Sequence, residues 1–257
     1  MGPDLIGVLA ALAYGLVIGS FLNVCIHRLP SNQSLLRPRS RCPSCGAPVR
    51  WYDNIPALSY VVLRGRCRSC QAPISVQYPL VEITTAALFL LAYRRDGLSW
   101  ALLSDLLLLS ALVVLGLIDL HHRILPNRIT YSGTIAGVLL GALVPGRSVA
   151  EALIGAGAGF LALFLFAEIY LRWRGVEGMG MGDAKMMAML GAFLGWKGAA
   201  LALLIGSLAG SAVGIGLLLA RRGNLQSALP FGTFLALGGV VASLWGDGII
   251  RWYWTGF

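Results

Sequence analysis

Two aspartates, Asp119 and Asp183, stand beside breaks in otherwise apolar sequence, where a carboxylate could take part in a reaction. Asp119 closes an apolar run in "GLIDLHHRILPN", and Asp183 follows "GMGMG" at the start of another run. Two carboxylates that approach each other share one proton, because both cannot ionise easily. The ionised group can then act as a base on water while the protonated group donates to a carbonyl oxygen. This pair predicts hydrolysis of the aspartic-protease type.

The residues around Asp183 predict an active-site loop made of Gly178, Gly180, Gly182 and Lys185. Glycines let a substrate backbone approach closely and give a segment conformational freedom. A simpler alternative is that Asp183 caps the N-terminus of a helix and has no part in a reaction.

Most of the methionines are concentrated in one segment, residues 179–189. Methionine adapts to varied apolar partners, so these side chains could receive a hydrophobic helix of a substrate. Ordinary packing between helices is the alternative, and it is the commoner role.

Four cysteines form two Cys-x-x-Cys pairs, Cys42 with Cys45 and Cys67 with Cys70, separated by 21 residues. This spacing is close to that of four-cysteine zinc sites. Four thiolates complete a tetrahedron and leave no open position for a substrate, so we expect structural Zn²⁺. The alternatives are two disulfides, which a reducing cytoplasmic location disfavours, or thiols that bind no metal. Cys25 lies in an apolar run and is interpreted as a packing residue.

The composition indicates the elements that must position these residues. The chain has 257 residues, of which 57% are hydrophobic and 12% charged, and this is typical of a polytopic membrane protein. We expect an all-α fold with about eight transmembrane helices and one cytoplasmic zinc-binding loop between the first two. The expected runs are residues 5–26, 79–93, 98–118, 129–144, 149–171, 184–196, 198–220 and 231–250.

The net charge of +9 is explained by topology. If the N-terminus is periplasmic and eight runs cross the membrane, most lysines and arginines fall on the cytoplasmic side. This asymmetry suits anionic membrane lipids. Because the aromatic residues of the basic loop are few and not interleaved with its arginines, we expect no nucleic-acid partner.

Other carboxylates in the apolar runs support a competing hypothesis, a transporter with a proton path through Glu82, Asp105, Glu151 and Glu168. No inverted repeat with paired broken helices is evident. Asp105 is about 21 Å along a helix from Asp119, so we expect it to have a separate, hydrogen-bonding role.

The sequence resembles the type IV prepilin peptidases, which are bifunctional leader peptidases and N-methyltransferases of bacterial inner membranes. The resemblance runs almost end to end. Its motifs are "GSFLNVCIHRLP" (19–30), the two cysteine pairs, "WYDNIPALSY" (51–60), "LRGRCRSC" (63–70), "ISVQYPLVE" (74–82), the Asp119 turn, "GMGMGDAK" (178–185) and "LPFGTFLALG" (229–238).

The resemblance implies that Asp119 and Asp183 are the catalytic pair of an intramembrane aspartic peptidase. The substrates would be prepilins or pseudopilins of type IV pili or type II secretion, cleaved at the cytoplasmic face after the glycine that ends a short basic leader. The expected division is a first transmembrane helix (1–26), a zinc loop linked to methyl transfer (27–78) and a peptidase region (79–257). A subunit that only docks pilins is a further alternative.

The resemblance also implies that S-adenosylmethionine methylates the new N-terminal amine. No glycine-rich fingerprint for that cofactor occurs in the chain. Candidates for contact with the cofactor or the leader are Asn23, Asp53, Asn54 and Glu82. Asp53 and Asn54 could equally shape a turn.

Overall fold

A computed structural model describes residues 5–176, 179–220 and 229–255, and this part of the chain is helical, with isolated β-bridges and no strand. Each expected apolar run overlaps an α-helix. Within the described residues, five helices are long and apolar enough to cross a membrane: α1 (Leu5–Arg28), α4 (Trp100–His122), α6 (Val149–Arg174), α7 (Met181–Leu219) and α8 (Phe231–Thr255). The expectation of an all-helical membrane protein is therefore confirmed.

The other two long helices are shorter or more polar. α3 (Gln77–Asp96) contains Glu82 and ends in a run of charged residues. α5 (Asn127–Gly141) has 15 residues, fewer than the approximately 20 that a membrane crossing needs. That these two helices also cross the membrane stays a prediction.

The chain forms two compact units, residues 1–97 and 98–257. In the first, α1 packs against α3 at close range. A Cβ atom on Gly15 would lie 2.5 Å from Cα of Ala86, and one on Gly19 would lie 2.7 Å from Cα of Glu82. Small residues four apart let two helix backbones approach in this way. The loop between the two helices carries the 3-10 helix η1 (Trp51–Asn54) and the short helix α2 (Leu58–Val62).

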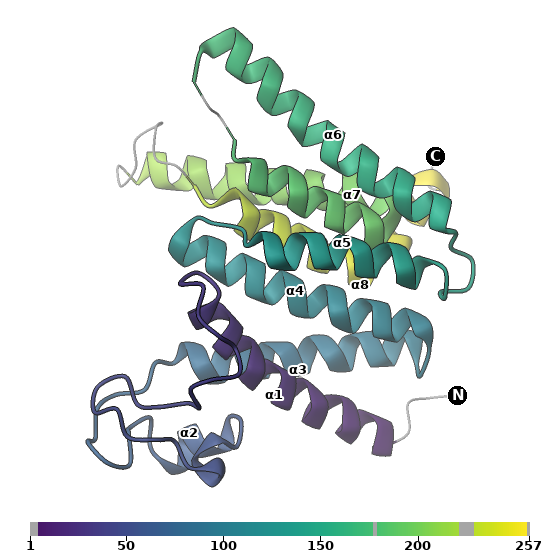
Figure 1. Ribbon diagram of the computed structural model, residues 1–257. Helices are drawn as coiled ribbons and strands as arrows, with labels where there is room; N and C mark the ends of the chain where they lie inside the picture. Colours follow the sequence, from purple (N-terminus) through teal and green to yellow (C-terminus); the bar gives the residue numbers. More distant parts are fainter. Residues whose placement is uncertain (1–4, 177–178, 221–228, 256–257) are drawn as a thin grey trace. The chain divides into compact units, whose positions relative to one another are not determined.

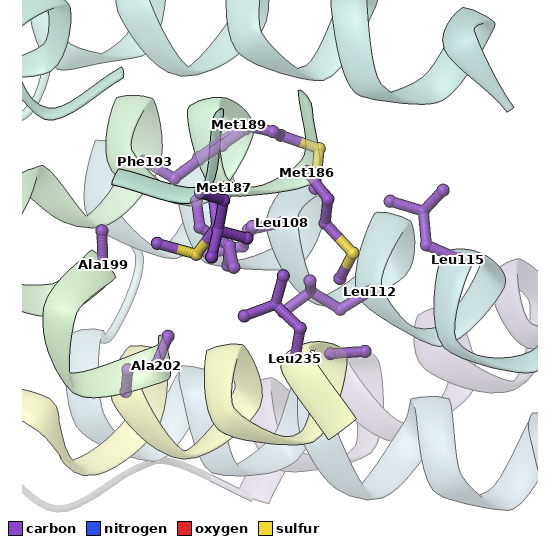
Figure 2. Close-up of a cluster of buried hydrophobic side chains, with 14 of the residues drawn as sticks. Leu108, Leu112, Leu115, Met186, Met187, Met189, Phe193, Ala199, Ala202 and Leu235 are labelled. Carbon is purple, nitrogen blue, oxygen red and sulfur yellow. The ribbon is translucent and has the colours of Figure 1, made fainter. Parts of the chain in front are cut away.

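The second unit is a bundle of α4 to α8 (Figure 1). α7 packs against α5, α6 and α8, and α8 also packs against α4. The core of the bundle joins leucines of α4 to the methionines of α7 and Leu235 of α8, as Figure 2 shows. Met186, Met187 and Met189 are almost fully buried there. For these three residues the packing alternative is confirmed, and a role in receiving substrate is wrong.

A break divides α7 where two separate runs are expected. Gly195 lies within this 39-residue helix at φ 68° and ψ 175°, which are not helical angles. Glycine adopts a positive φ without the steric cost that other residues incur. The runs 184–196 and 198–220 are therefore two helical segments joined at Gly195.

The packing units do not follow the expected functional division. α3 packs with α1 in the first unit, whereas the expected division assigns residues 79–257 to the peptidase. The expected division concerns the roles of the segments rather than their packing, and it stays a prediction.

Candidate active site and metal centre

Asp119 lies in the last turn of α4 and is buried, with 6% of its surface exposed. α4 ends at Arg123, which has the left-handed conformation and donates its backbone N–H to the carbonyl of Asp119 at 2.8 Å. Pro126 then starts α5 from an extended conformation, and its fixed φ suits that position. The expected break after Asp119 is confirmed, and it places the carboxylate beside a tight turn.

Asp183 is the third residue of α7, whose N-cap is Gly180. Gly180 holds the N-cap position and Asp183 lies inside the first turn, so the N-cap alternative for Asp183 is wrong. The helix begins earlier than expected, at Met181, because Gly182 is accommodated in its first turn. A carboxylate in the first turn of a helix is stabilised by the helix dipole.

The two aspartates line one cavity of about 270 Å³, together with Arg123, Gly180 and Lys185. A water molecule occupies roughly 30 Å³ in the liquid, so the cavity has room for several waters beside the carboxylates. The structure thus brings together two acids that are 64 positions apart in sequence.

The N-terminus of α8 holds Asp119 in place. The backbone N–H of Thr233 donates to Oδ2 of Asp119 at 2.8 Å, and the Thr233 hydroxyl lies 3.3 Å from the same oxygen. A Cβ atom on Gly232 would meet Cγ and Oδ2 of Asp119 at 3.0 Å, so the absence of a side chain there leaves room for the carboxylate. Sequence reasoning missed these contacts, although "FGT" directly after Pro230 is a recognisable helix start.

Leu125 is wedged between the starts of two helices. A Cβ atom on Gly182 would lie 3.1 Å from Cβ of Leu125, and one on Gly232 would lie 3.0 Å from its Cδ1. The expected glycine role, close approach of a substrate strand, is thus replaced at Gly182 by close approach to Leu125. Gly180 has no such neighbour, since the nearest atom to its Cβ position is Oδ2 of Asp183 at 3.8 Å.

Lys185 joins α7 to α5 at the same cavity. Its Nζ donates to Oδ1 of Asn127 at 3.0 Å and lies 5.3 Å from the centre of the Tyr131 ring. Gly178, the remaining residue of the expected loop, lies outside the described residues. Met179 and Met181 line a separate recess of about 170 Å³ with Phe164 of α6.

The other carboxylates considered for a proton path have structural partners. Ser243 donates to Oδ1 of Asp105 at 3.1 Å. Glu151 forms a capping box with Ser148 at the start of α6, and Glu168 pairs with an arginine one turn along the same helix. The expected hydrogen-bonding role of Asp105 is confirmed.

The four cysteines of the loop come together from two similar turns. In the first, the backbone N–H groups of Cys42 and Gly46 bond to Ala47 and Cys42. In the second, those of Cys67 and Gln71 bond in the same way to Ala72 and Cys67. Gly46 and Gln71 occupy equivalent positions, both with positive φ.

The sulfur positions suit a tetrahedral metal. The four Sγ atoms lie within 4.8 Å of one another, and those of Cys42 and Cys70 are 3.8 Å apart. Zinc–sulfur bonds of about 2.3 Å give tetrahedral sulfur separations of about 3.8 Å. All four are free thiols, so the disulfide alternative is wrong. Backbone N–H groups of Cys45 and Ser44 lower the pKa of Cys42 to about 6, whereas hydrogen bonds with the neighbouring thiols help to raise the pKa of Cys70 to about 11.

The residues considered for methyl transfer make internal contacts in the first unit. Asn23 donates to the carbonyl of Tyr78 at 3.0 Å, and buried Glu82 accepts from the N–H of Ala57 at 2.7 Å. The first bond joins α1 to the start of α3, and the second anchors the loop to α3. Asn54 is exposed.

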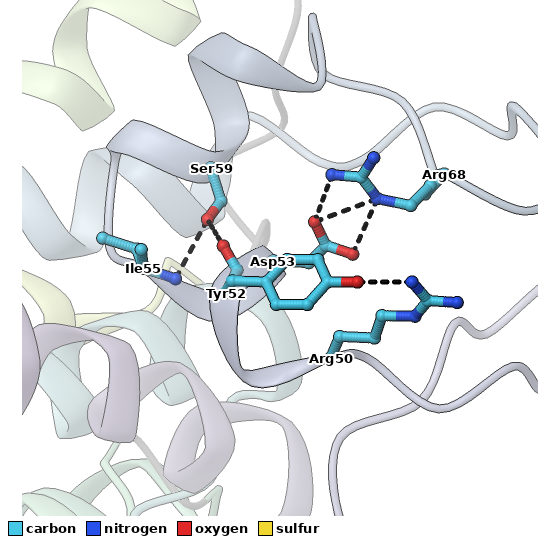
Figure 3. A network of polar contacts seen from close by, with 6 residues as sticks. All are labelled: Arg50, Tyr52, Asp53, Ile55, Ser59 and Arg68. Carbon is cyan, nitrogen blue, oxygen red and sulfur yellow. Dashed lines mark hydrogen bonds and ion pairs between the residues drawn. The ribbon is translucent and has the colours of Figure 1, made fainter.

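Asp53 forms a bidentate ion pair with Arg68, shown in Figure 3. Its Oδ1 accepts from Nη2 at 2.7 Å, and its Oδ2 accepts from Nε at 2.9 Å. These hydrogen bonds lower the pKa of Asp53 below its usual value. Tyr52 lies between Arg68 and Arg50, with each guanidinium 5.7 Å from its ring centre. This network ties η1 to the second cysteine turn.

Comparisons with known proteins match both parts of the chain. Residues 13–95 match the model of the bacterial peptidase A24 N-terminal domain, and residues 106–215 match that of the type IV leader peptidase family. A prepilin leader peptidase/N-methyltransferase of Aeromonas hydrophila is 43% identical over 95% of this chain and 92% of its own length.

Two further relatives carry the same printed name. One, of Pseudomonas aeruginosa, is 37% identical over 96% of this chain and 93% of its own length. The other, of Myxococcus xanthus, is 48% identical over 80% of this chain and 62% of its own length. No solved structure matches.

Proposed function

The chain belongs to the type IV leader peptidase family, and from this premise we propose that it is a membrane aspartic endopeptidase that removes the leaders of prepilins. The observation that carries the proposal is the cavity lined by both Asp119 and Asp183. Among the described residues, no other pair of acidic side chains lines either cavity of the second unit.

The proposed reaction uses one ionised and one protonated carboxylate. The ionised carboxylate takes a proton from water, the water oxygen bonds to the peptide carbon, and the second carboxyl gives its proton to the carbonyl oxygen. The first carboxyl then passes its proton to the amide nitrogen as the C–N bond breaks, and the second recovers a proton from the intermediate. The products are the leader's carboxyl terminus and a new N-terminal amine.

The proposed location is the bacterial inner membrane. The basic residues of the loop and of the turns after α4 and α6 favour an orientation with both aspartates at the cytoplasmic face and the N-terminus in the periplasm. Anionic lipids would surround these basic segments. Cleavage after the last leader glycine at that face follows from the family resemblance. We assign residues 79–257 to the peptidase and residues 27–78 to the loop.

We assign structural Zn²⁺ to Cys42, Cys45, Cys67 and Cys70. The four sulfur positions fit this ion, and the ion would stabilise a loop that buries few apolar side chains. All four positions around the metal are taken, so the site supplies stability rather than a reactive water.

The proposed second activity is N-methylation of the new terminus with S-adenosylmethionine, since the relatives' printed names join the two activities. Of the four residues considered for this role, Asn23, Asp53 and Glu82 use their polar groups in contacts within the first unit. Contact of these residues with the cofactor or the leader stays a prediction. Transfer of a labelled methyl group to the cleaved product would test this activity.

The peptidase proposal is tested with purified full-length protein and a model prepilin. We expect Asp119→Asn and Asp183→Asn each to lower the cleavage rate by at least about 1,000-fold, as removal of one member of a catalytic set does. Asp105→Asn, the same change in the same helix as Asp119, serves as the matched control and should leave the rate within about threefold, like an ordinary substitution away from a site.

Each alternative has its own outcome in this experiment. A pilin-docking subunit would bind the prepilin without shortening it. A transporter would show proton-coupled flux that depends on Asp105 or Glu168. Full cleavage by either of the Asp119 and Asp183 variants would contradict the proposed pair.

A further inference from the structure

The contacts of the two aspartates differ in a way that bears on which of them is ionised. Asp119 receives the backbone N–H of Thr233 on Oδ2, with the Thr233 hydroxyl near the same oxygen. Among the described residues, no side chain donates a hydrogen bond to the Asp183 carboxylate, whose Oδ2 lies 3.8 Å from the Cβ position of Gly180. Hydrogen bonds to a carboxylate favour its charged form.

Helix dipoles do not distinguish the two acids. Asp183 lies in the first turn of α7, and Asp119 faces the first turn of α8, so each is near a positive helix end. The difference therefore lies in the donors that α8 supplies to Asp119 and in the cation next to it. Arg123, one turn after Asp119, lines the same cavity.

Thr233 also fixes the first turn of α8 on α4. Its hydroxyl donates to the carbonyl oxygen of Gly116 at 2.9 Å, one turn before Asp119. A hydroxyl has one proton, so this bond and the approach to Asp119 compete for it. The bond to Gly116 sets the orientation of α8 and thereby aims the Thr233 N–H at Oδ2.

We propose that Thr233 is a positioning residue that keeps Asp119 ionised, so that Asp119 is the base that acts on water and Asp183 carries the proton to the carbonyl oxygen. This assignment rests on the proposed peptidase function. Both Thr233 contacts end on Oδ2, so Oδ1 is the oxygen that takes the proton of water. The opposite assignment would place the proton on the acid that has the better donors.

The charged groups around Asp119 come from two helices. α4 and its C-cap contribute Arg123, and α7 contributes Asp183 and Lys185. α5 contributes the amide of Asn127, and the first turn of α8 has no ionisable side chain. A change at Thr233 therefore alters the hydrogen bonding of Asp119 and leaves the number of charges in the cavity unchanged.

The experiment measures the pH dependence of prepilin cleavage by Thr233→Val in full-length protein. Valine has the shape of threonine without the hydroxyl. We expect the acidic limb of the kcat profile to move to higher pH, because the ionised base becomes less stable. At a pH on that limb kcat should fall about three- to tenfold, with KM unchanged. This is the range of one ordinary hydrogen bond, because the hydroxyl lies 3.3 Å from Oδ2 and is shared with the Gly116 carbonyl.

Thr233→Ser is the matched control, because it retains the hydroxyl and should restore the wild-type profile. Thr233→Ala carries the same expectation as the valine variant and replaces it if valine prevents folding. A merely structural role would lower the rate equally at all pH values and would not be rescued by serine in this pH-dependent manner.

The inference and the proposed function fail differently. If the wild type cleaves, both aspartate-to-asparagine variants are inactive and the limb does not move in Thr233→Val, the assignment of Thr233 is overturned and the peptidase stands. If either asparagine variant cleaves normally, the dyad itself is wrong.

Discussion

The cysteine cluster of the first unit and the aspartate cavity of the second both join two distant segments of sequence, but they are held by different means. Each cysteine pair lies in its own turn, closed by backbone hydrogen bonds within six residues. The aspartates lie at the ends of α4 and α7, and a third helix, α8, supplies the contacts that hold Asp119. The cluster is therefore built from local pieces, whereas the cavity depends on the packing of the bundle.

This difference teaches where each site is vulnerable. A metal ligand set tolerates changes outside its two turns, because the metal itself brings the turns together. A carboxylate pair has no ion to bring its members together, so small displacements of any contributing helix change its geometry. Three predictions test this contrast, from the largest expected effect to the smallest.

The largest effect is expected from Cys42→Ser. Loss of one thiolate should reduce bound zinc from about one ion per chain to nearly none, because structural zinc sites need four protein ligands. Metal content is measured by mass spectrometry, and stability by thermal unfolding in detergent. We expect the unfolding midpoint to fall while the cleavage step changes less.

Cys25→Ala is the matched control, because Cys25 is buried in α1 and lies outside the cluster. It should retain the metal. The separation of the two sites would be wrong if Cys42→Ser kept its zinc. It would also be wrong if the cleavage rate fell while the unfolding midpoint stayed that of the wild type.

An intermediate effect is expected from Gly232→Ala. The new methyl group would lie 3.0 Å from Cγ and Oδ2 of Asp119, which is too close for ordinary packing. We expect the cleavage rate to fall about 10- to 100-fold, as misplacement of catalytic groups by an ångström does. Single-turnover cleavage of a model prepilin measures this rate.

Gly180→Ala provides the comparison, since it lines the same cavity but its Cβ position has 3.8 Å to the nearest atom. Its cleavage rate should stay within about threefold of wild type. Equal losses in the two variants would show that steric contact with Asp119 is not the cause.

The smallest effect concerns the two cysteine turns. Gly46 and Gln71 both have positive φ, which is costly for a residue with a side chain. Gly46→Ala should weaken zinc binding and Gln71→Gly should strengthen it, each by about 1 kcal/mol. Nothing lies within 4 Å of a Cβ on Gly46, so the expected change is conformational rather than steric. Titration with a competing chelator measures the zinc affinity of both variants. If the affinity changed in the same direction in the two variants, the two turns would not be equivalent.

Features with local signals were predictable from the sequence. Apolar runs located the long helices, and the division of α7 followed from the lengths of runs 184–196 and 198–220. The cysteine spacing indicated one cluster, because each pair already lies within one turn. Asp119 and Asp183 stood out since each interrupts apolar sequence beside a helix end.

Features that depend on packing were not predictable in this way. Thr233 is 114 positions from Asp119, and no spacing rule links a threonine in a helix start to a distant carboxylate. The N-cap alternative for Asp183 was wrong because Gly182 fits inside the helix against Leu125, a contact that appears only once the turn between α4 and α5 is packed against α7. The anchoring roles of Asn23 and Glu82 likewise require the pairing of α1 with α3.

The position of Leu125 has a practical consequence for mutational surveys. One aliphatic side chain sets the spacing between the helix starts that carry Gly182 and Gly232, so trimming it would leave the bulk of the bundle intact while loosening the acids. Variant libraries sorted by thermal stability or expression level would not distinguish such variants from the wild type. Only a readout of peptide-bond scission would reveal that they are inactive.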